Sequence, residues 1–153
     1  MTKTFSLQPL VHLAQQKNEA ATRKLGQLNQ LEQAAQSKLD TLMQYRKDYQ
    51  TRFQEAAQSG MSQADMRNFQ NFIQRLDDAI TQQRNTTEHA RHSVQTGREE
   101  LQEAQRKMKS FDTLAQRHLD GEKKLEAKIE QRQQDEHTGR FAAIKMANAH
   151  NEN

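Results

Sequence analysis

Apolar side chains recur along the sequence at alternating steps of three and four residues, most regularly from Met66 to Ile129. The positions reached are Met66, Phe69, Ile73, Leu76, Ile80, Gln83, Thr87, Ala90, Val94, Gly97, Leu101, Ala104, Met108, Phe111, Ala115, His118, Glu122, Leu125 and Ile129. Because most of these side chains are apolar, they place a narrow apolar stripe on one side of a long helix. A stripe of this width is typical of a coiled coil and predicts a partner helix.

A second apolar stripe precedes the first and is less regular, with a mean step of about 3.5 residues, the coiled-coil value. Its positions are Leu10, Ala14, Lys17, Ala21, Leu25, Leu28, Leu31, Ala35, Leu39, Leu42, Tyr45, Tyr49, Phe53 and Ala56. Ser6 and Pro9 predict where this helix starts, because Ser caps helix N-termini and Pro is tolerated in the first turn. Gly60 predicts the end of the helix, and Ser62 with Asp65 resembles a capping box that starts the next one.

The connection between the two helices is short, so the helices must run antiparallel. When the sequence is folded about residues 60 and 61, Tyr45 faces Leu76 and Leu25 faces Gly97, and the residue numbers of every pair add to 121 or 122. The predicted fold class is all-α, a long two-helix antiparallel coiled-coil hairpin with the C-terminal helix overhanging. We predict a single hairpin domain over 1–153, with helix 1 at about 6–58, the turn at about 59–62, helix 2 at about 63–140 and a frayed tail at about 141–153.

Two layers in the middle of the predicted seam contain a polar residue, namely Leu39 with Gln83 and Ala35 with Thr87. We expect these layers to be weak and the hairpin to be firmest near its turn, because buried apolar side chains supply most of the stability. Gly26 and Gly97 fall at nearly the same level. This placement fits either a close approach of the helices or a shared flexible point.

The composition agrees with a seam rather than a thick core, because only 33% of the 153 residues are hydrophobic and 5% are aromatic. The net charge is +3 with both signs interspersed, so no nucleic-acid partner is expected, although a basic coiled-coil nucleic-acid binder remains an alternative. No run approaches the ~18 apolar residues of a membrane span, so no direct membrane insertion is predicted. Met1 to Leu13 does not have the pattern of a signal peptide.

The sequence gives little support for catalysis. His89 and His92 stand three residues apart, a spacing that suits a metal, but no acidic or Cys ligands accompany them, which favours a solvated helix face. No glycine-rich nucleotide loop is present, and a hairpin offers no concave pocket of the usual size. We therefore predict a protein that is not an enzyme, with no catalytic residue, cofactor or metal.

Surfaces are more informative, beginning with the apolar side chains that crowd both sides of the turn. They are Tyr45, Tyr49, Phe53, Phe69, Phe72, Ile73 and Leu76. These side chains either broaden the core at the turn or form an exposed aromatic patch for a protein partner. At the opposite end, the second helix keeps its stripe beyond Ala115, so an overhang without an intramolecular partner is expected there. The charged flanks of this overhang serve either solubility or entry into a channel of a larger assembly.

Three groups of residues carry a resemblance to a known family. The N-terminal group is Phe5, Leu7, Leu10, Leu13, Ala14, Leu25 and Gly26. The middle group is Leu39, Leu42, Tyr45, Arg46, Asp48, Tyr49, Gly60, Asn68, Phe69, Phe72, Ile73, Leu76, Ala79 and Ile80. The C-terminal group is Asp135, Glu136, Arg140, Ala142 and Ala143. In order and spacing these groups resemble the FliJ family of flagellar type III export proteins, with Gly121 and Gly139 as departures in the tail.

The resemblance implies a non-enzymatic component of the flagellar type III protein export apparatus. Such a protein is a stalk that links the export ATPase ring to the export gate and helps to handle substrate chaperones. The implied partners are the export ATPase hexamer, the cytoplasmic part of the export-gate membrane protein and substrate chaperones. The implied location is cytoplasmic, peripheral at the inner face of the cell membrane. The alternatives are the equivalent stalk of a virulence type III secretion system, a generic coiled-coil scaffold, and a homodimer whose helices pair between chains.

The resemblance also implies two sets of binding residues. The export-gate set is Leu42, Tyr45, Tyr49, Phe72, Leu76 and Ala79. The ATPase-ring set is Leu7, Leu10, Leu119, Leu125 and Ile129. The gate set coincides with the crowded residues beside the turn, which favours an exposed patch over a broadened core.

Overall fold

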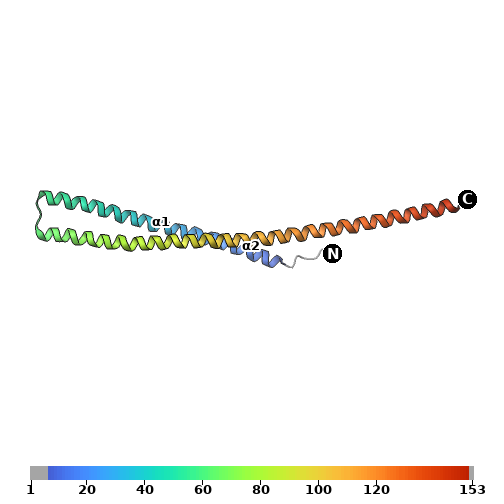
Figure 1. Ribbon diagram of the computed structural model, residues 1–153, viewed down its shortest axis with the longest axis horizontal. Helices are drawn as coiled ribbons and strands as arrows, with labels where there is room; N and C mark the ends of the chain where they lie inside the picture. Colours follow the sequence, from blue (N-terminus) through green and yellow to red (C-terminus); the bar gives the residue numbers. More distant parts are fainter. Residues whose placement is uncertain (1–6, 152–153) are drawn as a thin grey trace. The chain divides into compact units, whose positions relative to one another are not determined.

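The computed structural model describes residues 7–151 and contains two long helices, α1 (Gln8–Ser59) and α2 (Gln63–Asn151). The described residues contain no strand, and the two helices pack together, which confirms the predicted all-α hairpin (Figure 1). The predicted cap at Ser6 lies outside the described residues. The predicted end of the second helix near residue 140 is wrong, because α2 continues to Asn151. The residues after Arg140 include four Ala and contain neither Gly nor Pro, so no strong helix breaker stops α2 before Asn151.

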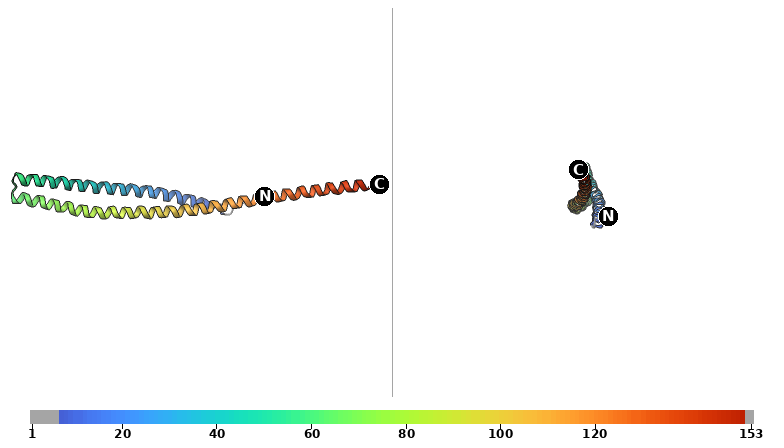
Figure 2. Two further views of the ribbon diagram at one scale, coloured as in Figure 1. Left: turned by 45° about the horizontal axis from the view of Figure 1, so that its top comes forward. Right: turned by 90° about the vertical axis from the view of Figure 1, so that its right-hand side faces the viewer.

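The chain divides into two compact units, and the division cuts across both helices. We call Gln16–Gln105 the hairpin unit, and the residues up to Gln15 together with those from Arg106 onward the terminal unit. Within the hairpin unit α1 and α2 lie side by side, joined at the turn (Figure 2). The expectation that residues 1–153 form a single domain stays a prediction.

The turn is built as the sequence predicts. Gly60 has φ of 93°, and it is the only residue of the described chain with positive φ. The backbone N–H of Asp65 donates to Ser62 Oγ at 3.1 Å, and the N–H of Met66 donates to the Ser62 carbonyl at 3.0 Å. Gly60 therefore ends α1 in the left-handed conformation, and Ser62 caps the N-terminus of α2.

The stripe predicted for α2 is the face that the helix buries. Every predicted position from Phe69 to Glu122 is buried or half-buried, whereas Met66, Leu125 and Ile129 at the two ends are exposed. The alternation of three and four therefore continues without interruption over this stretch. In heptad terms, Ile73 and Ile80 occupy position a, and Leu76 and Gln83 occupy position d.

The stripe predicted for α1 is wrong at four positions, each by one residue. The structure exposes Leu10, Lys17, Leu31 and Tyr45, and it covers Val11, Asn18, Glu32 and Arg46 instead. With these replacements α1 also alternates strictly by three and four from Leu7 to Ala56. The residue numbers of facing layers then add to 122, as in Phe53 opposite Phe69 and Leu25 opposite Gly97. The stripe predicted for α1 rests on hydrophobicity alone, whereas the geometry of the paired helices also places polar residues in the seam.

Two of these polar seam residues reach charged partners on the other helix. The Arg46 side chain donates to the Asp77 carboxylate through Nε and, at 3.4 Å, through Nη2, and this hydrogen bond raises the pKa of Arg46 above its usual value. Glu32, two heptads earlier, lies 4.0 Å from Arg91 Nε. Asp77 and Arg91 are also two heptads apart. The hairpin therefore repeats one arrangement, a seam residue of α1 paired with a flanking residue of α2, with the charges reversed.

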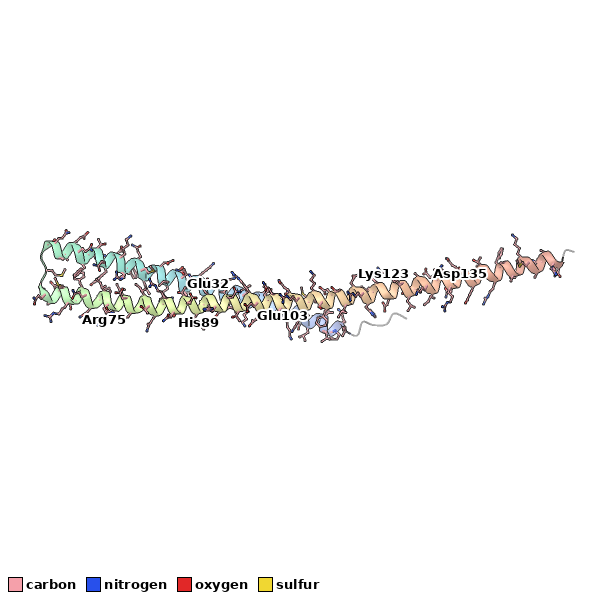
Figure 3. All side chains as sticks on the ribbon, in the orientation of Figure 1. Glu32, Arg75, His89, Glu103, Lys123 and Asp135 are labelled. Atoms are coloured by element: carbon pink, nitrogen blue, oxygen red, sulfur yellow. The ribbon has the colours of Figure 1, made fainter. Side chains whose placement is uncertain are left out.

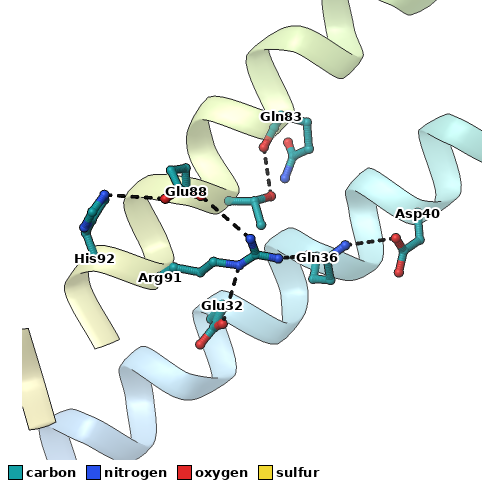
Figure 4. A network of polar contacts seen from close by, with 8 residues as sticks. Glu32, Gln36, Asp40, Gln83, Glu88, Arg91 and His92 are labelled. Atoms are coloured by element: carbon teal, nitrogen blue, oxygen red, sulfur yellow. Dashed lines mark hydrogen bonds and ion pairs between the residues drawn. The ribbon is translucent and has the colours of Figure 1, made fainter. Parts of the chain in front are cut away.

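The polar layers in the middle of the seam are among the best covered of the described residues, and the expectation that they are weak stays a prediction. Thr87 is 2% exposed and Gln83 is 8% exposed. Gln83 Nε2 donates to the Ala35 carbonyl across the seam at 3.0 Å, and Thr87 Oγ1 donates to the Gln83 carbonyl at 2.8 Å. Figure 4 shows Gln83 and, in the same view, Arg91, whose guanidinium donates to Gln36 at 2.9 Å. Because their polar atoms have partners, burying them carries little penalty.

Gly26 and Gly97, which the sequence places at nearly the same level of the hairpin, have different surroundings. A Cβ at Gly97 would lie 2.9 Å from Leu28 Cδ1 and 3.4 Å from Leu25 Cδ1, so the helices approach closely there. A Cβ at Gly26 would meet nothing within 4 Å. Of the two interpretations, close approach therefore accounts for Gly97, and Gly26 lies on the exposed face of α1.

Candidate interaction surfaces

The residues of the implied export-gate set lie at three neighbouring levels of the hairpin unit, and we call them the turn-side patch. They are Leu42, Tyr45, Tyr49, Phe72, Leu76 and Ala79. Leu42, Tyr49 and Leu76 belong to the seam. The other three occupy heptad position g, and g positions of antiparallel helices face each other along one flank. Lys24 and Glu100 hold the same positions farther along, and their charged groups meet at 2.9 Å.

Aromatic contacts fix the geometry of the turn-side patch. The ring of Tyr49 lies 4.3 Å from the ring of Phe72 and 5.0 Å from that of Phe69, both tilted. Phe53 meets Phe69 edge-on at 5.6 Å. Tilted and edge-on arrangements at these separations are the favourable ones for aromatic pairs. Phe72 is therefore held in place by packing while one side of its ring stays accessible.

The six residues differ in how much a partner can reach. Tyr45 is 59% exposed and Phe72 is 42% exposed, whereas Leu76 is 8% exposed and belongs to the core. Leu42, Tyr49 and Ala79 are half-buried. Sequence reasoning placed Tyr45 in the seam opposite Leu76, but Arg46 occupies that layer and leaves the phenol ring outside. Tyr45 and Phe72 are thus the accessible part of the patch.

The opposite flank of the hairpin unit carries polar groups instead of aromatic ones. A groove of about 430 Å³ runs there, lined by Met43, Arg46, Lys47, Gln50, Thr51, Asp77, Ile80, Thr81 and Arg84. Basic groups outnumber the single carboxylate in this groove. Met43 is its exposed apolar residue, and it provides a comparison for the aromatic flank.

The described residues contain no cluster of three or more His, Cys, Asp or Glu side chains that suits a metal. His92 Nε2 lies 3.5 Å from Glu88, and both His89 and His92 are exposed, as the solvated-face interpretation predicts. Among the same residues, no helix is long and apolar enough to span a membrane.

In the terminal unit the implied ATPase-ring residues are mostly accessible. Leu7 is half-buried, and Leu10, Leu119, Leu125 and Ile129 are exposed. Past Glu122 every described residue of α2 is exposed, as expected for an overhang. The five residues do not share one face. Leu10 lies on the g flank and Leu119 on the opposite, e flank, while Leu125 and Ile129 continue the seam of α2.

Five further large apolar side chains of the terminal unit are exposed and lie outside the predicted sites. They are Leu13, Leu114, Phe141, Ile144 and Met146. Leu114 occupies heptad position g, which is not one of the a and d positions that define the predicted seam. Phe141, Ile144 and Met146 fall in the segment predicted to be frayed. The signal that identifies them is the absence of Gly and Pro after Arg140, together with four Ala residues.

Comparison with known proteins agrees with these features and gives the class of the chain. The sequence model of the family described as "Flagellar FliJ protein" matches residues 2–146, nearly the whole chain. The chain therefore belongs to the FliJ family, a class of helical proteins associated with flagellar type III export.

Two relatives and one solved structure show how far the similarity extends. The flagellar FliJ protein of Escherichia coli K12 is 28% identical over 145 residues, covering 95% of this chain and 99% of that protein. The flagellar FliJ protein of Salmonella typhi is 26% identical with the same coverage. The structure of a putative YscO homolog, CT670 from Chlamydia trachomatis, superimposes with a TM-score of 0.70 at 14% identity, covering 94% of this chain and 97% of that one. At this identity the third similarity supports the fold alone.

Proposed function

We propose that this protein is the stalk of a flagellar type III export apparatus. One end binds the export ATPase ring and the turn end binds the cytoplasmic part of the export-gate membrane protein. Membership of the FliJ family supports the association with export. The observation that supports two separate binding surfaces is that exposed apolar side chains gather in each of the two units. One group lies beside the turn, and the other lies in the overhang of the terminal unit.

The turn-side patch is proposed as the gate-binding surface because it combines exposure with rigidity. Tyr45 presents most of its ring to solvent, and Phe72 is buttressed by Tyr49 at 4.3 Å. Aromatic side chains held in place by their neighbours are the usual anchors of protein interfaces. Leu76 is buried in the seam, so it contributes to binding only indirectly, by keeping α1 and α2 packed together beneath the patch. Its substitution would disturb folding as well as binding.

The test of this end is a pull-down of the purified cytoplasmic gate domain with a Tyr45→Ala, Phe72→Ala double variant. Circular dichroism should stay nearly unchanged, since neither residue occupies an a or d layer of the seam, and gate binding should be lost. Met43→Ala serves as the matched control, because Met43 has similar exposure on the opposite flank. If the double variant binds the gate domain as well as the unsubstituted protein does, the patch assignment is wrong.

The overhang is proposed as the ATPase-binding end. Leu125 and Ile129 continue the seam of α2 beyond the last described residue of α1 and stand 59% and 50% exposed. An apolar stripe without an intramolecular partner is a typical surface for docking into a groove of another protein. Truncation after Ala115 should eliminate association with the ATPase while the hairpin unit still folds.

A point variant sharpens this test. Ile129→Asp places a carboxylate in the stripe and should weaken ATPase association, whereas Gln131→Asp places it about 200° away around the helix and should not. Equal ATPase binding by the truncated protein and the full chain would overturn the assignment.

We further infer that substrate chaperones bind this protein and that it acts in the cytoplasm, peripherally at the inner face of the cell membrane. Both follow from the family resemblance rather than from a particular surface. Titration of purified chaperones against the full chain, monitored by calorimetry, tests the first. Co-sedimentation with membranes that contain or lack the export gate tests the second.

A further inference from the structure

The seam stripe of α2 continues past the end of its partner helix with a definite order of side chains. The last layer with a described partner is Ala115 opposite Leu7, and both residues are half-buried. The stripe then continues through six further a and d positions, which are His118, Glu122, Leu125, Ile129, Arg132 and Glu136. Figure 3 marks this stretch of α2 by the labels of Lys123 and Asp135. From Lys123 onward all its residues are exposed.

This order is self-complementary when read in the opposite direction. If a second copy lies antiparallel with the level of Ala127 at the centre, Leu125 faces Ile129 of the other copy. Glu122 then faces Arg132, and His118 faces Glu136. Each a position meets a d position, which is the relation that α1 and α2 have in the hairpin unit. The two Leu–Ile layers therefore pair apolar side chains, the two Glu122–Arg132 layers pair opposite charges, and in the two outer layers His118 meets the carboxylate of Glu136.

We propose that the overhang is a homotypic docking surface, on which a second copy of this chain binds as a short antiparallel coiled coil over residues 118–136. Charge complementarity selects this occupant. Glu122 already lies half-buried in the stripe with its Oε1 3.2 Å from His118 Nε2, and a second copy adds the guanidinium of Arg132 from across the seam.

A shift of this alignment by one heptad in either direction loses the property. A shift by one heptad in one direction places Glu122 opposite Leu125 and Ile129 opposite His118. A shift in the other direction places Ile129 opposite Arg132 and Leu125 opposite Glu136. Both alternatives bury a charge against an apolar side chain, which is costly. The sequence therefore specifies the register as well as the partner.

The flanks of this dimer limit its strength. Lys128 meets Lys128 of the second copy across the two-fold axis on the g flank, and Glu126 meets Glu126 on the e flank, so like charges are close on both sides. Two Leu–Ile layers supply the apolar area, far less than a stable dimer interface buries. The association is therefore weak and reversible, and it forms when the protein is concentrated. If the proposed function holds, the dimer covers Leu125 and Ile129 and competes with the ATPase ring.

The experiment uses the full chain in sedimentation equilibrium from ~5 to ~500 µM, where mass action reveals weak self-association. The unsubstituted protein should move towards dimer with concentration. Glu122→Arg places Arg opposite Arg132 in both Glu122–Arg132 layers and should weaken dimerisation by at least tenfold. Arg132→Glu places two carboxylates there and should do the same. The double variant Glu122→Arg, Arg132→Glu exchanges the charges within each layer and should restore dimerisation. A monomer at every concentration, or a double variant as weak as the single ones, would overturn the proposal.

Cross-linking provides an independent measurement, because the chain contains no Cys. Lys128→Cys places a thiol beside its own copy across the axis, in the positions that Lys24 and Glu100 hold in the hairpin unit, and a short bis-maleimide should link two chains there. Ala127→Cys, which points outward at heptad position f, is the matched control and should not be linked. Equal linking of both variants would indicate non-specific association and refute the register. ATPase binding is measured separately, so that a failure of the dimer leaves the ring assignment intact.

Discussion

The two helical glycines of the hairpin unit, Gly26 and Gly97, provide the sharpest test of its packing, because the same substitution has different consequences at each. Replacing a helical Gly by Ala removes backbone freedom from the unfolded chain and stabilises a helix by about 0.5–1 kcal/mol. Gly26→Ala should gain this amount in full, since its new Cβ meets nothing within 4 Å. Gly97→Ala gains the same propensity but places its Cβ 2.9 Å from Leu28 Cδ1.

The contact at Gly97 can be relieved only by moving a side chain. The atom in the way is the end of a flexible leucine, so Leu28 can shift at a cost of about 0.5–1.5 kcal/mol. The two effects nearly cancel, and we expect Gly97→Ala to change the free energy of unfolding little. Gly97→Leu should destabilise by about 1–3 kcal/mol, because the larger side chain must also displace Leu25, whose Cα would lie 4.0 Å from the new Cβ.

Urea unfolding followed by circular dichroism measures these differences through the midpoint, provided the slope with denaturant stays constant. The comparison that matters is between the two alanine variants, because helix propensity is common to both. If Gly97→Ala stabilises the protein as much as Gly26→Ala does, the helices do not approach closely at this level, and the close packing described above is incorrect.

Three further predictions concern polar groups of the hairpin unit. Gln83→Ala should destabilise the protein by about 1–2 kcal/mol through the lost hydrogen bond to Ala35 and the cavity left behind, whereas Gln83→Leu should be nearly neutral. Urea midpoints compare both variants with the exposed control Gln82→Ala. Equal losses for the Ala and Leu variants would contradict the reasoning. Ser62→Ala should cost about 1 kcal/mol by removing the cap of α2, as thermal unfolding monitors, and an unchanged midpoint would show that the cap contributes nothing. Lys24 and Glu100 are both about half exposed. A double-mutant cycle should therefore give a coupling free energy of ~0.5 kcal/mol or less, which decreases as the salt concentration is raised. A larger coupling free energy that persists at high salt would contradict this.

The sequence predicts most of the fold because the stripe of α2 is apolar enough to be traced by hydrophobicity. The turn follows from Gly60 and Ser62, and the register follows from their position. The stripe of α1 is harder to predict. Two of the four positions at which the prediction differs from the structure are charged seam residues, Glu32 and Arg46. Their partners Arg91 and Asp77 lie on the other helix, and a pattern of apolar residues does not register a charge that is satisfied from across the seam.

The candidate sites show the same limit. The crowding of aromatic residues beside the turn is visible in the sequence, but which rings are exposed depends on a shift of one residue. Once Arg46 occupies the seam, Tyr45 turns to solvent. The exposed residues after Arg140 were missed because a terminal segment was expected to fray. Their helix formation follows from local propensity, which was given too little weight there.

The unbroken alternation of three and four in both helices has a geometric consequence. A sustained repeat of this kind winds two helices around each other in a left-handed sense, with one full turn in roughly 150 Å. From the level of Tyr45 to that of Lys24 the flank they share therefore swings by roughly 75° around the axis. A partner that binds directly over Tyr45 and Phe72 therefore finds Lys24 and Glu100 pointing in a different direction around the hairpin axis. A ligand that contacts both must curl around the hairpin, and a flat one is confined to the neighbourhood of the turn.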